Sequence, residues 1–218
     1  SISNDELGKR VDTNDAWIRS RTGITARRVV GADESLGELS GLAAERALEM
    51  AGWQADSLDL IVLATSTPDD LFGSAPRLQA RIGAVNAVAF DLTAACSGFL
   101  FGLVTAAQYI RSGAMRRILV VGADQLSRWV DWDDRRSCVL FGDAAGALVI
   151  EASNDGKDDL EGFLLRSDGR RGAVLQLPQV TERRELIGDA SHQRGGFEPI
   201  QMNGQEVYKF AVREVPAI

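Results

Sequence analysis

Histidine and cysteine are scarce in this chain, and their scarcity restricts its chemistry. The 218 residues include one histidine and two cysteines, Cys96 and Cys138. With so few of these side chains, and no Cys/His spacing typical of metal ligands, we expect no metal site. Two cysteines do not make a disulfide framework, so we expect a reducing compartment and predict a cytoplasmic protein.

Long apolar runs and an excess of positive charge are also absent. No run approaches the roughly 20 apolar residues that a membrane span needs, and the start, SISNDELGKR, lacks the basic-then-apolar pattern of a signal peptide. The net charge of −7 argues against nucleic acid as a main partner. With 45% hydrophobic residues, the chain can bury a core as one large domain or two small ones.

The middle of the chain alternates strand and helix patterns, which indicates an α/β protein with parallel strands. The expected strands are 58–65, 87–92 and one centred on 118–121, and the expected helices are 35–52, 74–83 and 97–111. We expect two strands in 137–152, joined through 142–146. A strand pair around the turn 168–172 is predicted for 163–177, and the polar segment 182–199 is interpreted as a loop.

The end of the chain carries an apolar stripe at helical spacing that has nothing left to pack against. The residues of this stripe are Val207, Phe210, Ala211, Glu214 and Val215. An exposed apolar helix at a terminus favours an incomplete sequence. The chain also starts at Ser1 without an initiator Met. We therefore expect both ends to be cut.

Cys96 lies where an apolar strand pattern changes into an apolar helix pattern. On the first turn of a buried helix, a thiol faces unpaired backbone N–H groups and the positive end of the helix dipole, which favour the thiolate. The small residues 93–95, 97 and 98 leave room for a substrate. From this pattern alone, a nucleophile and an inert buried cysteine are equally good interpretations.

Five Arg-Arg doublets stand out in an acidic chain: 27–28, 116–117, 135–136, 170–171 and 183–184. Most are interpreted as solvated surface charge, and the alternative is that some bind phosphate through their guanidinium forks. Trp17 and Arg21 extend the alternative, since an indole can stack on a base while an arginine holds a phosphate. The pattern alone favours Trp17 as the cap of a small core.

The other candidates have simpler interpretations. His192 is the only histidine that could serve as a base for a nucleophilic cysteine, but its polar surroundings favour a surface position. Asp143 is interpreted as a turn aspartate that bonds its own backbone, with a catalytic acid as the alternative. Cys138, in the strand-like SCVLF, is expected in the core.

Together these residues show that the chain resembles a β-ketoacyl-acyl carrier protein synthase III, which starts type II fatty-acid synthesis. The resemblance covers essentially the whole length. Six blocks occur in the family's order: VDTNDAWIRSRTGI, LIVLATSTPDDLFGSAP, AFDLTAACSGF, YIRSGAMRRILVVGAD, DDRRSCVLFGDAAGALVI and MNGQEVYKFAV. The resemblance implies a thiolase-like layered α/β fold of two similar halves in a homodimer. Residues 1–152 would be the N-terminal half without its first strand, and 153–218 a linker and the start of the second half.

The resemblance also implies a mechanism and a set of site residues. Cys96 would attack an acyl-CoA primer, typically acetyl-CoA, and the acyl-enzyme would condense with malonyl-acyl carrier protein. No cofactor is implied, because CoA enters as part of the substrate. Trp17 would stack on the CoA adenine with Arg135 on its other side, and Arg21 and Thr22 would line the entrance. By the same resemblance, Phe72 would reach across the dimer toward the acyl pocket, Met202 and Gly204 would line the tunnel, and Lys209 would help to dock the carrier protein.

The chain departs from the family at several points. Ala144 replaces a usual glycine, and neither a PHQAN-type histidine motif nor a GNTS-type asparagine motif occurs. We therefore expect this polypeptide alone to be marginally stable and incompetent in condensation. Two alternatives stay open: a non-catalytic module that binds CoA or a carrier protein, and another cysteine-dependent enzyme, including other condensing enzymes of the thiolase superfamily.

Overall fold

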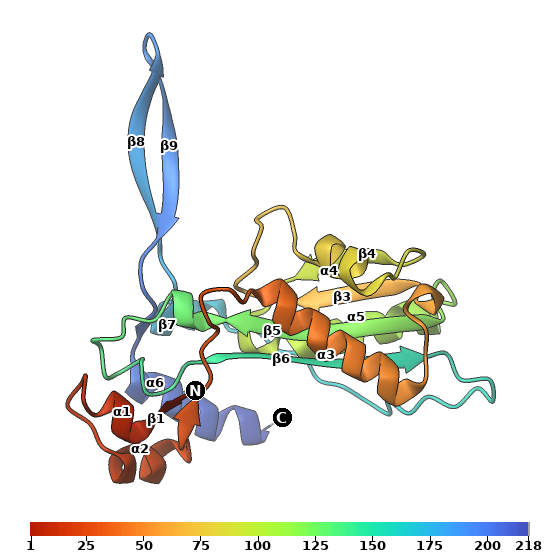
Figure 1. The fold of residues 1–218 in the computed structure, drawn as a ribbon, viewed down its shortest axis with the longest axis horizontal. Coiled ribbons are helices and arrows are strands. Elements are labelled where there is room, and N and C mark those ends of the chain that lie inside the picture. The colour runs from red at the N-terminus through yellow and green to blue at the C-terminus, as the bar shows by residue number, and fades with distance from the viewer. Residues whose placement is uncertain (218) are drawn as a thin grey trace. The chain divides into compact units, whose positions relative to one another are not determined.

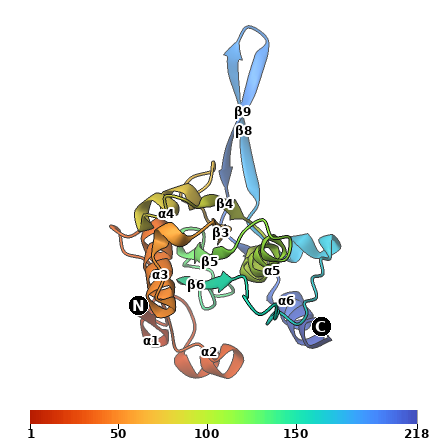
Figure 2. The same ribbon diagram turned by 90° about the vertical axis from the view of Figure 1, so that its right-hand side faces the viewer.

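The computed structural model describes residues 1–217, which form two compact units (Figure 1, Figure 2). Unit 1 consists of residues 1–28, 126–142 and 166 onward, and unit 2 of residues 29–125 and 143–165. Ile218, the end of the segment predicted to begin a second half, lies outside the described residues. Each unit is assembled from segments that are separated in the sequence, so these units do not test a division of the chain at residue 152. That division stays a prediction.

Unit 2 is built on a four-stranded sheet in the order β4-β3-β5-β6. Its elements are α3 (Leu36–Ala51), β3 (Leu60–Ala64), α4 (Ala75–Ile82), β4 (Val88–Leu92), α5 (Gly98–Arg111), β5 (Arg117–Gln125) and β6 (Asp143–Glu151). The strands β4, β3 and β5 are parallel, and β6 runs antiparallel to β5. The predicted α/β class is confirmed, as are the three strands and three helices expected in the middle of the chain.

Helices cover both faces of this sheet, and for that reason the sequence of β3 is apolar throughout. Ile61 and Leu63 belong to the core cluster that includes α3, whereas Leu60 and Val62 belong to the cluster that includes α5. All five residues of β3 are buried. The two helices therefore lie on opposite faces of the sheet, as Figure 1 shows.

Two glycines bring α5 close to the sheet. A Cβ at Gly98 would lie 3.2 Å from the Cβ of Ala64, and one at Gly102 would lie 3.2 Å from Cγ1 of Val120. Contacts this short exclude a larger side chain unless the helix shifts. The first turns of α5, which follow Cys96, are therefore held directly against β3 and β5.

Unit 1 contains short elements around a smaller core. These are β1 (Ile2–Ser3), α1 (Asn4–Leu7), α2 (Asp15–Thr22), β2 (Ala26–Arg27), β7 (Leu175–Gln176), β8 (Gln179–Ile187), β9 (Ala190–Phe197), β10 (Gln201–Met202) and α6 (Gly204–Arg213). Its buried apolar cluster consists of Leu7, Ile18, Val130, Cys138, Val139 and Ile200. The expected core position of Cys138 is confirmed, and the stripe near the C-terminus is helical as far as Arg213, the end of α6.

Two predictions for the second half of the chain are wrong. The segment 182–199 is not a loop, because β8 and β9 pair as an antiparallel hairpin whose tip contains Gly188 at φ +58°. The segment 163–177 holds no strand pair, since β7 pairs with β10. In both cases the partner strand, and not local apolar alternation, creates the strand.

The two strands expected in 137–152 are also only half correct. β6 is a strand, but residues 137–140 form a turn in which the Cys138 N–H donates to the carbonyl of Asp134 at 3.0 Å. The Leu140 N–H donates to the carbonyl of Ser137 at 2.9 Å. Burial in the core of unit 1 explains the apolar run without any strand.

Candidate functional site

Cys96 lies at the carboxyl end of β4, in a single 3₁₀ turn formed by Ala95–Ser97. Its side chain is exposed. Ala95, just before it, has φ +47° and is the one non-glycine residue with positive φ among residues 1–217. Such a conformation is strained for a residue with a Cβ, and strain of this kind is concentrated at functional sites. The bend turns the chain from strand to helix and presents the cysteine at the surface of unit 2.

The amino end of α5 adjoins Cys96. The N-cap residue Ser97 makes no side-chain hydrogen bond to this end of the helix. The Gly98 N–H donates to the carbonyl of Ala95. The Ser97 N–H donates to the carbonyl of Ala94 at 3.2 Å, so both of these N–H groups have partners. The amino end of α5 still carries the positive end of the helix dipole, which would stabilise an anion beside Cys96.

Two carboxylates at the same edge of the sheet fix the loops around Cys96. Asp91, in β4, accepts hydrogen bonds from the Ser74 and Ala75 N–H groups at 2.8 and 2.6 Å and so caps α4. Asp124, near the end of β5, accepts from the Ser66 N–H at 2.8 Å and from the Thr67 hydroxyl at 3.1 Å. Neither role was predicted from the sequence. Their position at the end of an apolar strand was the available signal.

Phe72 also belongs to unit 2 and follows β3 in a loop. Its side chain is fully exposed, and that of the preceding Leu71 is nearly so. The Phe72 N–H donates to the Asp70 carboxylate at 3.0 Å. Two large apolar side chains together on a loop expose an unusual amount of apolar surface.

The site residues predicted in unit 1 include a cluster around Trp17. The guanidinium carbon of Arg21 lies 4.5 Å from the centroid of the indole, and that of Arg135 lies 4.8 Å from it. Asn14 accepts from the Trp17 N–H at 2.8 Å and begins α2. The Thr22 hydroxyl donates to the carbonyl of Ile18 at 2.8 Å, so it is engaged within the same helix.

Met202, Gly204 and Lys209 follow one another at the end of unit 1. Met202 lines a pocket of about 420 Å³ together with Asp131, Asp134, Arg136, Ala173, Pro199, Ile200, Gln201 and Asn203. Hydrogen bonds from the Arg136 side chain hold the pKa of Asp134 below its usual range. Gly204 begins α6, and the exposed Lys209 ammonium pairs with Glu206 at 2.7 Å.

Other candidates are placed clearly by the structure. His192 is exposed on β9, so the expected surface position is confirmed. The turn interpretation of Asp143 is wrong, because it is buried and accepts from the Val30 N–H at 2.7 Å. Arg27 is an exception to the surface position expected for most of the Arg-Arg doublets, because it is buried. Composition identifies such doublets as charge but does not reveal which member faces the core.

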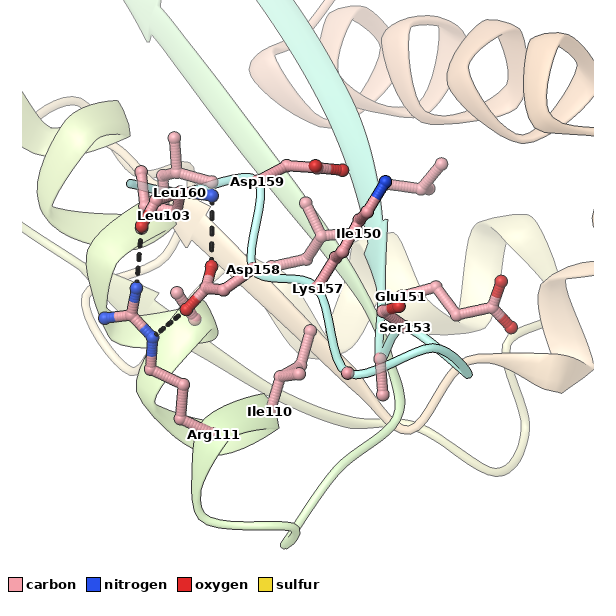
Figure 3. A pocket seen from close by; sticks show the side chains of 14 residues that line it. Leu103, Ile110, Arg111, Ile150, Glu151, Ser153, Lys157, Asp158, Asp159 and Leu160 are labelled. Atoms are coloured by element: carbon pink, nitrogen blue, oxygen red, sulfur yellow. Dashed lines mark hydrogen bonds and ion pairs between the residues drawn. The ribbon is translucent and has the colours of Figure 1, made fainter. Parts of the chain in front are cut away.

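A larger pocket of about 550 Å³ lies elsewhere in unit 2 (Figure 3). It is lined by the last three turns of α5, the end of β6 and the loop after it. Arg111 crosses it to the Asp158 carboxylate at 2.6 Å and donates to the carbonyl of Leu160 at 2.8 Å. Cys96 precedes the other end of α5, and no predicted site residue lines this pocket. It is therefore not the acyl site expected at Cys96.

Within residues 1–217, no group of three or more His, Cys, Asp or Glu residues is arranged to hold a metal ion. None of the helices described here is long and apolar enough to cross a membrane.

Comparison with known proteins gives a consistent result. The family model described as 3-oxoacyl-[acyl-carrier-protein (ACP)] synthase III matches residues 90–169. The β-ketoacyl-[acyl-carrier-protein] synthase III of Prochlorococcus marinus (strain MIT 9313) is 72% identical over 217 residues, which are 100% of this chain and 64% of that protein. The chain therefore spans about 64% of the length of this curated relative.

Solved structures agree. The 3-oxoacyl-(acyl carrier protein) synthase III of Pseudomonas aeruginosa PAO1 is 39% identical with a TM-score of 0.80, over 97% of this chain and 62% of that one. Another 3-oxoacyl-(acyl-carrier-protein) synthase III structure is 30% identical with a TM-score of 0.84, over 99% of this chain and 67% of that one.

Proposed function

We propose, since this chain belongs to the 3-oxoacyl-[acyl-carrier-protein] synthase III family, that the whole protein condenses an acyl-CoA primer with malonyl-acyl carrier protein. Acetyl-CoA is the proposed primer, and the product would start fatty-acid synthesis. The observation that carries this proposal is the exposed Cys96 on a strained turn between β4 and the amino end of α5. We further propose a cytoplasmic enzyme without a cofactor beyond its CoA and carrier-protein substrates.

The first step is acylation of Cys96. Its thiolate attacks the thioester carbonyl, the new S–C bond forms, and CoA leaves with the electron pair and takes up a proton. The negative oxygen formed in this step needs preorganised N–H donors. The amino end of α5, which the Ser97 side chain does not cap, adjoins Cys96 and is the proposed source of this stabilisation.

The second step needs groups that this chain does not carry. Malonyl-acyl carrier protein loses CO₂, and the electron pair released forms the new C–C bond to the acyl carbon while the Cys96 thiolate leaves. The enolate-like charge needs electrostatic support, which a histidine and an asparagine supply in the family pattern. His192 is exposed on a hairpin of unit 1. We therefore propose that the chain alone accepts an acyl group but does not complete condensation.

Unit 1 supplies the proposed CoA contacts. Adenine would stack on Trp17 with Arg135 over its other side, while Arg21 and Thr22 lie on the same helix. A ring held between the indole and a guanidinium needs roughly 7 Å, two stacking distances, whereas Arg135 lies 4.8 Å from the indole centroid. Arg135 would therefore swing outward when CoA binds.

The same unit carries the other proposed substrate contacts. Met202 and Gly204 would guide the rest of the substrate, and this is supported by the pocket that Met202 lines. Lys209 would meet the acidic carrier protein. The Lys209 side chain, which pairs with Glu206, is about half exposed.

A homodimer is proposed from two exposed features of unit 2. β4 is the edge strand of the sheet, and an unpaired edge is a template for pairing with a second copy. Val88 in this strand, together with Leu71 and Phe72, exposes apolar surface. Phe72 would insert into the partner copy and limit the depth of its acyl pocket.

The proposal is tested by intact-mass analysis of the protein after incubation with acetyl-CoA. We expect one acetyl adduct that is lost in Cys96→Ala and kept in the matched control Cys138→Ala. Malonyl-acyl carrier protein should discharge the adduct from the whole protein but not from this chain. No adduct on any variant, with CoA still bound, would favour the non-catalytic binding module instead.

A further inference from the structure

A buried polar network in unit 1 takes no part in the steps proposed above. Asn4 is 1% exposed and Arg27 is 4% exposed. An Arg27 Nη2 hydrogen bond to the Asn4 side-chain oxygen, at 2.8 Å, joins the two side chains. Both lie outside the cluster formed by Trp17 and its arginines.

The network connects α2 with the turn that carries Arg135. On one side, the Asn4 side-chain NH₂ donates to the carboxylate of Asp15, the first residue of α2, at 2.9 Å. It also donates to the carbonyl of Ile24, just beyond the C-cap of α2, at 2.8 Å. On the other side, Arg27 Nη2 donates to the carbonyl of Val139 at 3.2 Å. Val139 follows Arg135 by four residues in the turn-forming segment 134–140.

Simple core packing does not account for a guanidinium in this place. Burial lowers the pKa of Arg27, and its Nε has no hydrogen-bond partner. Its hydrogen bonds go to carbonyl and amide oxygens. A buried charge without a carboxylate partner costs more than an apolar side chain of the same volume. The buried position of Arg27 is therefore better explained by the backbone geometry that its hydrogen bonds impose than by a gain in stability.

We propose that Arg27 and Asn4 are positioning residues for CoA binding, and this rests on the proposed stacking of adenine at Trp17. They hold the backbone of α2 and of the turn at a fixed separation. The movement that admits a purine is then confined to the exposed Arg135 side chain, which closes again through its 2.7 Å hydrogen bond to the carbonyl of Asp12. Without the network, the turn 134–140 would move together with Arg135, and the Arg135 side chain would cover the adenine less often.

The test is steady-state kinetics of the whole protein with two acyl donors. One donor is acetyl-CoA, and the other is acetyl-pantetheine, which lacks the adenosine part. For Arg27→Met we expect the KM for acetyl-CoA to rise about five- to tenfold, which corresponds to the loss of a cation–π contact on a desolvated base. The kcat and the KM for acetyl-pantetheine should not change. The matched control is Arg28→Met, which removes the same charge from the exposed neighbour.

A second variant covers the case in which Arg27→Met does not fold. Asp15→Ala removes one link of the network from a partly exposed residue, and a smaller rise of about two- to threefold in the same KM is expected. Equal rises for both donors, or a KM for acetyl-CoA no higher than that of Arg28→Met, would overturn the proposal.

Trp17→Ala separates this proposal from the one it rests on. If Trp17→Ala raises the KM for acetyl-CoA and Arg27→Met does not, the stacking stands and the positioning role fails. If Trp17→Ala leaves this KM unchanged, the stacking proposal itself is wrong.

Discussion

The central sheet of unit 2 and the β8–β9 hairpin of unit 1 are both regular β-structure, yet different interactions hold them. Every residue of β3 is buried between two helices, whereas every residue of β8 is exposed. The sheet is stabilised by apolar burial on both faces. The hairpin depends on cross-strand hydrogen bonds and on its base, where Phe197 packs edge-on against Trp129 at 5.6 Å between ring centroids.

This difference extends to the functional groups. Cys96 lies on a strained turn between the edge strand β4 and α5, and the first turns of α5 pack closely against the buried strands β3 and β5. The Trp17 cluster lies on short elements joined by a polar network. We conclude that the proposed nucleophile is supported mainly by packing and the proposed binding group mainly by hydrogen bonds.

The largest expected effect is on the sheet. Leu119 in β5 is 0% exposed, so Leu119→Ala should lower the free energy of unfolding by about 3 kcal/mol through lost burial and a cavity. In the hairpin, Leu186 is 62% exposed, and Leu186→Ala should change it by less than about 0.5 kcal/mol. Urea unfolding followed by circular dichroism measures both. Equal losses would remove the contrast between the two regions.

A smaller effect is expected where α5 contacts the sheet. Gly102→Leu places a side chain against Val120 and should cost about 1–3 kcal/mol of stability. The same shift of α5 should change the rate at which iodoacetamide labels Cys96. Gly146→Leu is the control, because nothing lies within 4 Å of a Cβ there. An unchanged labelling rate in Gly102→Leu would show that packing of α5 does not set the position of Cys96.

In unit 1, the burial of the Cys138 thiol should make the free energy of unfolding depend on pH. Burial raises the pKa of the Cys138 thiol, although the charge of Arg27 opposes this rise. The folded state thus keeps a proton that the unfolded chain loses above about pH 8.5. This contribution to stability is fully present below that pH and is lost as the pH rises through the folded-state pKa.

Cys138→Ala removes the titrating group. Its free energy of unfolding should therefore fall less than that of the parent protein between about pH 8 and about pH 10. Val139→Ala, a buried change in the same turn, should keep the alkaline loss of the parent. Parallel pH profiles for Cys138→Ala and the parent protein would contradict the expectation.

The smallest effect on stability is expected on the exposed side of unit 1. Lys209→Ala removes a surface ion pair with Glu206 and should change the free energy of unfolding by less than about 0.5 kcal/mol. If Lys209 meets the carrier protein, the same variant should weaken that binding severalfold, mostly through slower association at low salt. Surface plasmon resonance at two salt concentrations measures this, with Lys157→Ala as the control. Unchanged binding would remove Lys209 from the docking surface.

Local patterns in the sequence determined the α/β class and the strands and helices on either side of Cys96. Continuous apolar runs predicted β3, β4 and β5, and helical spacing predicted α3, α4 and α5. These patterns succeed because burial against neighbouring layers imposes a periodicity on the residues themselves. The place of Cys96, between a strand and a helix, followed from the same patterns.

Only the tertiary structure decided the features that depend on distant partners. β8 pairs with β9 although both are polar, and β7 pairs with β10 some 25 residues away. Folding brings backbone groups within hydrogen-bonding distance of the side chains of Arg27, Asn4 and Asp124. These hydrogen bonds give the three residues their structural roles. A polar side chain has the same letter in the sequence whether it faces water or a buried carbonyl. The sequence therefore specified the strands and helices on either side of Cys96, whereas folding decided which arginines lie against Trp17 and which one is buried.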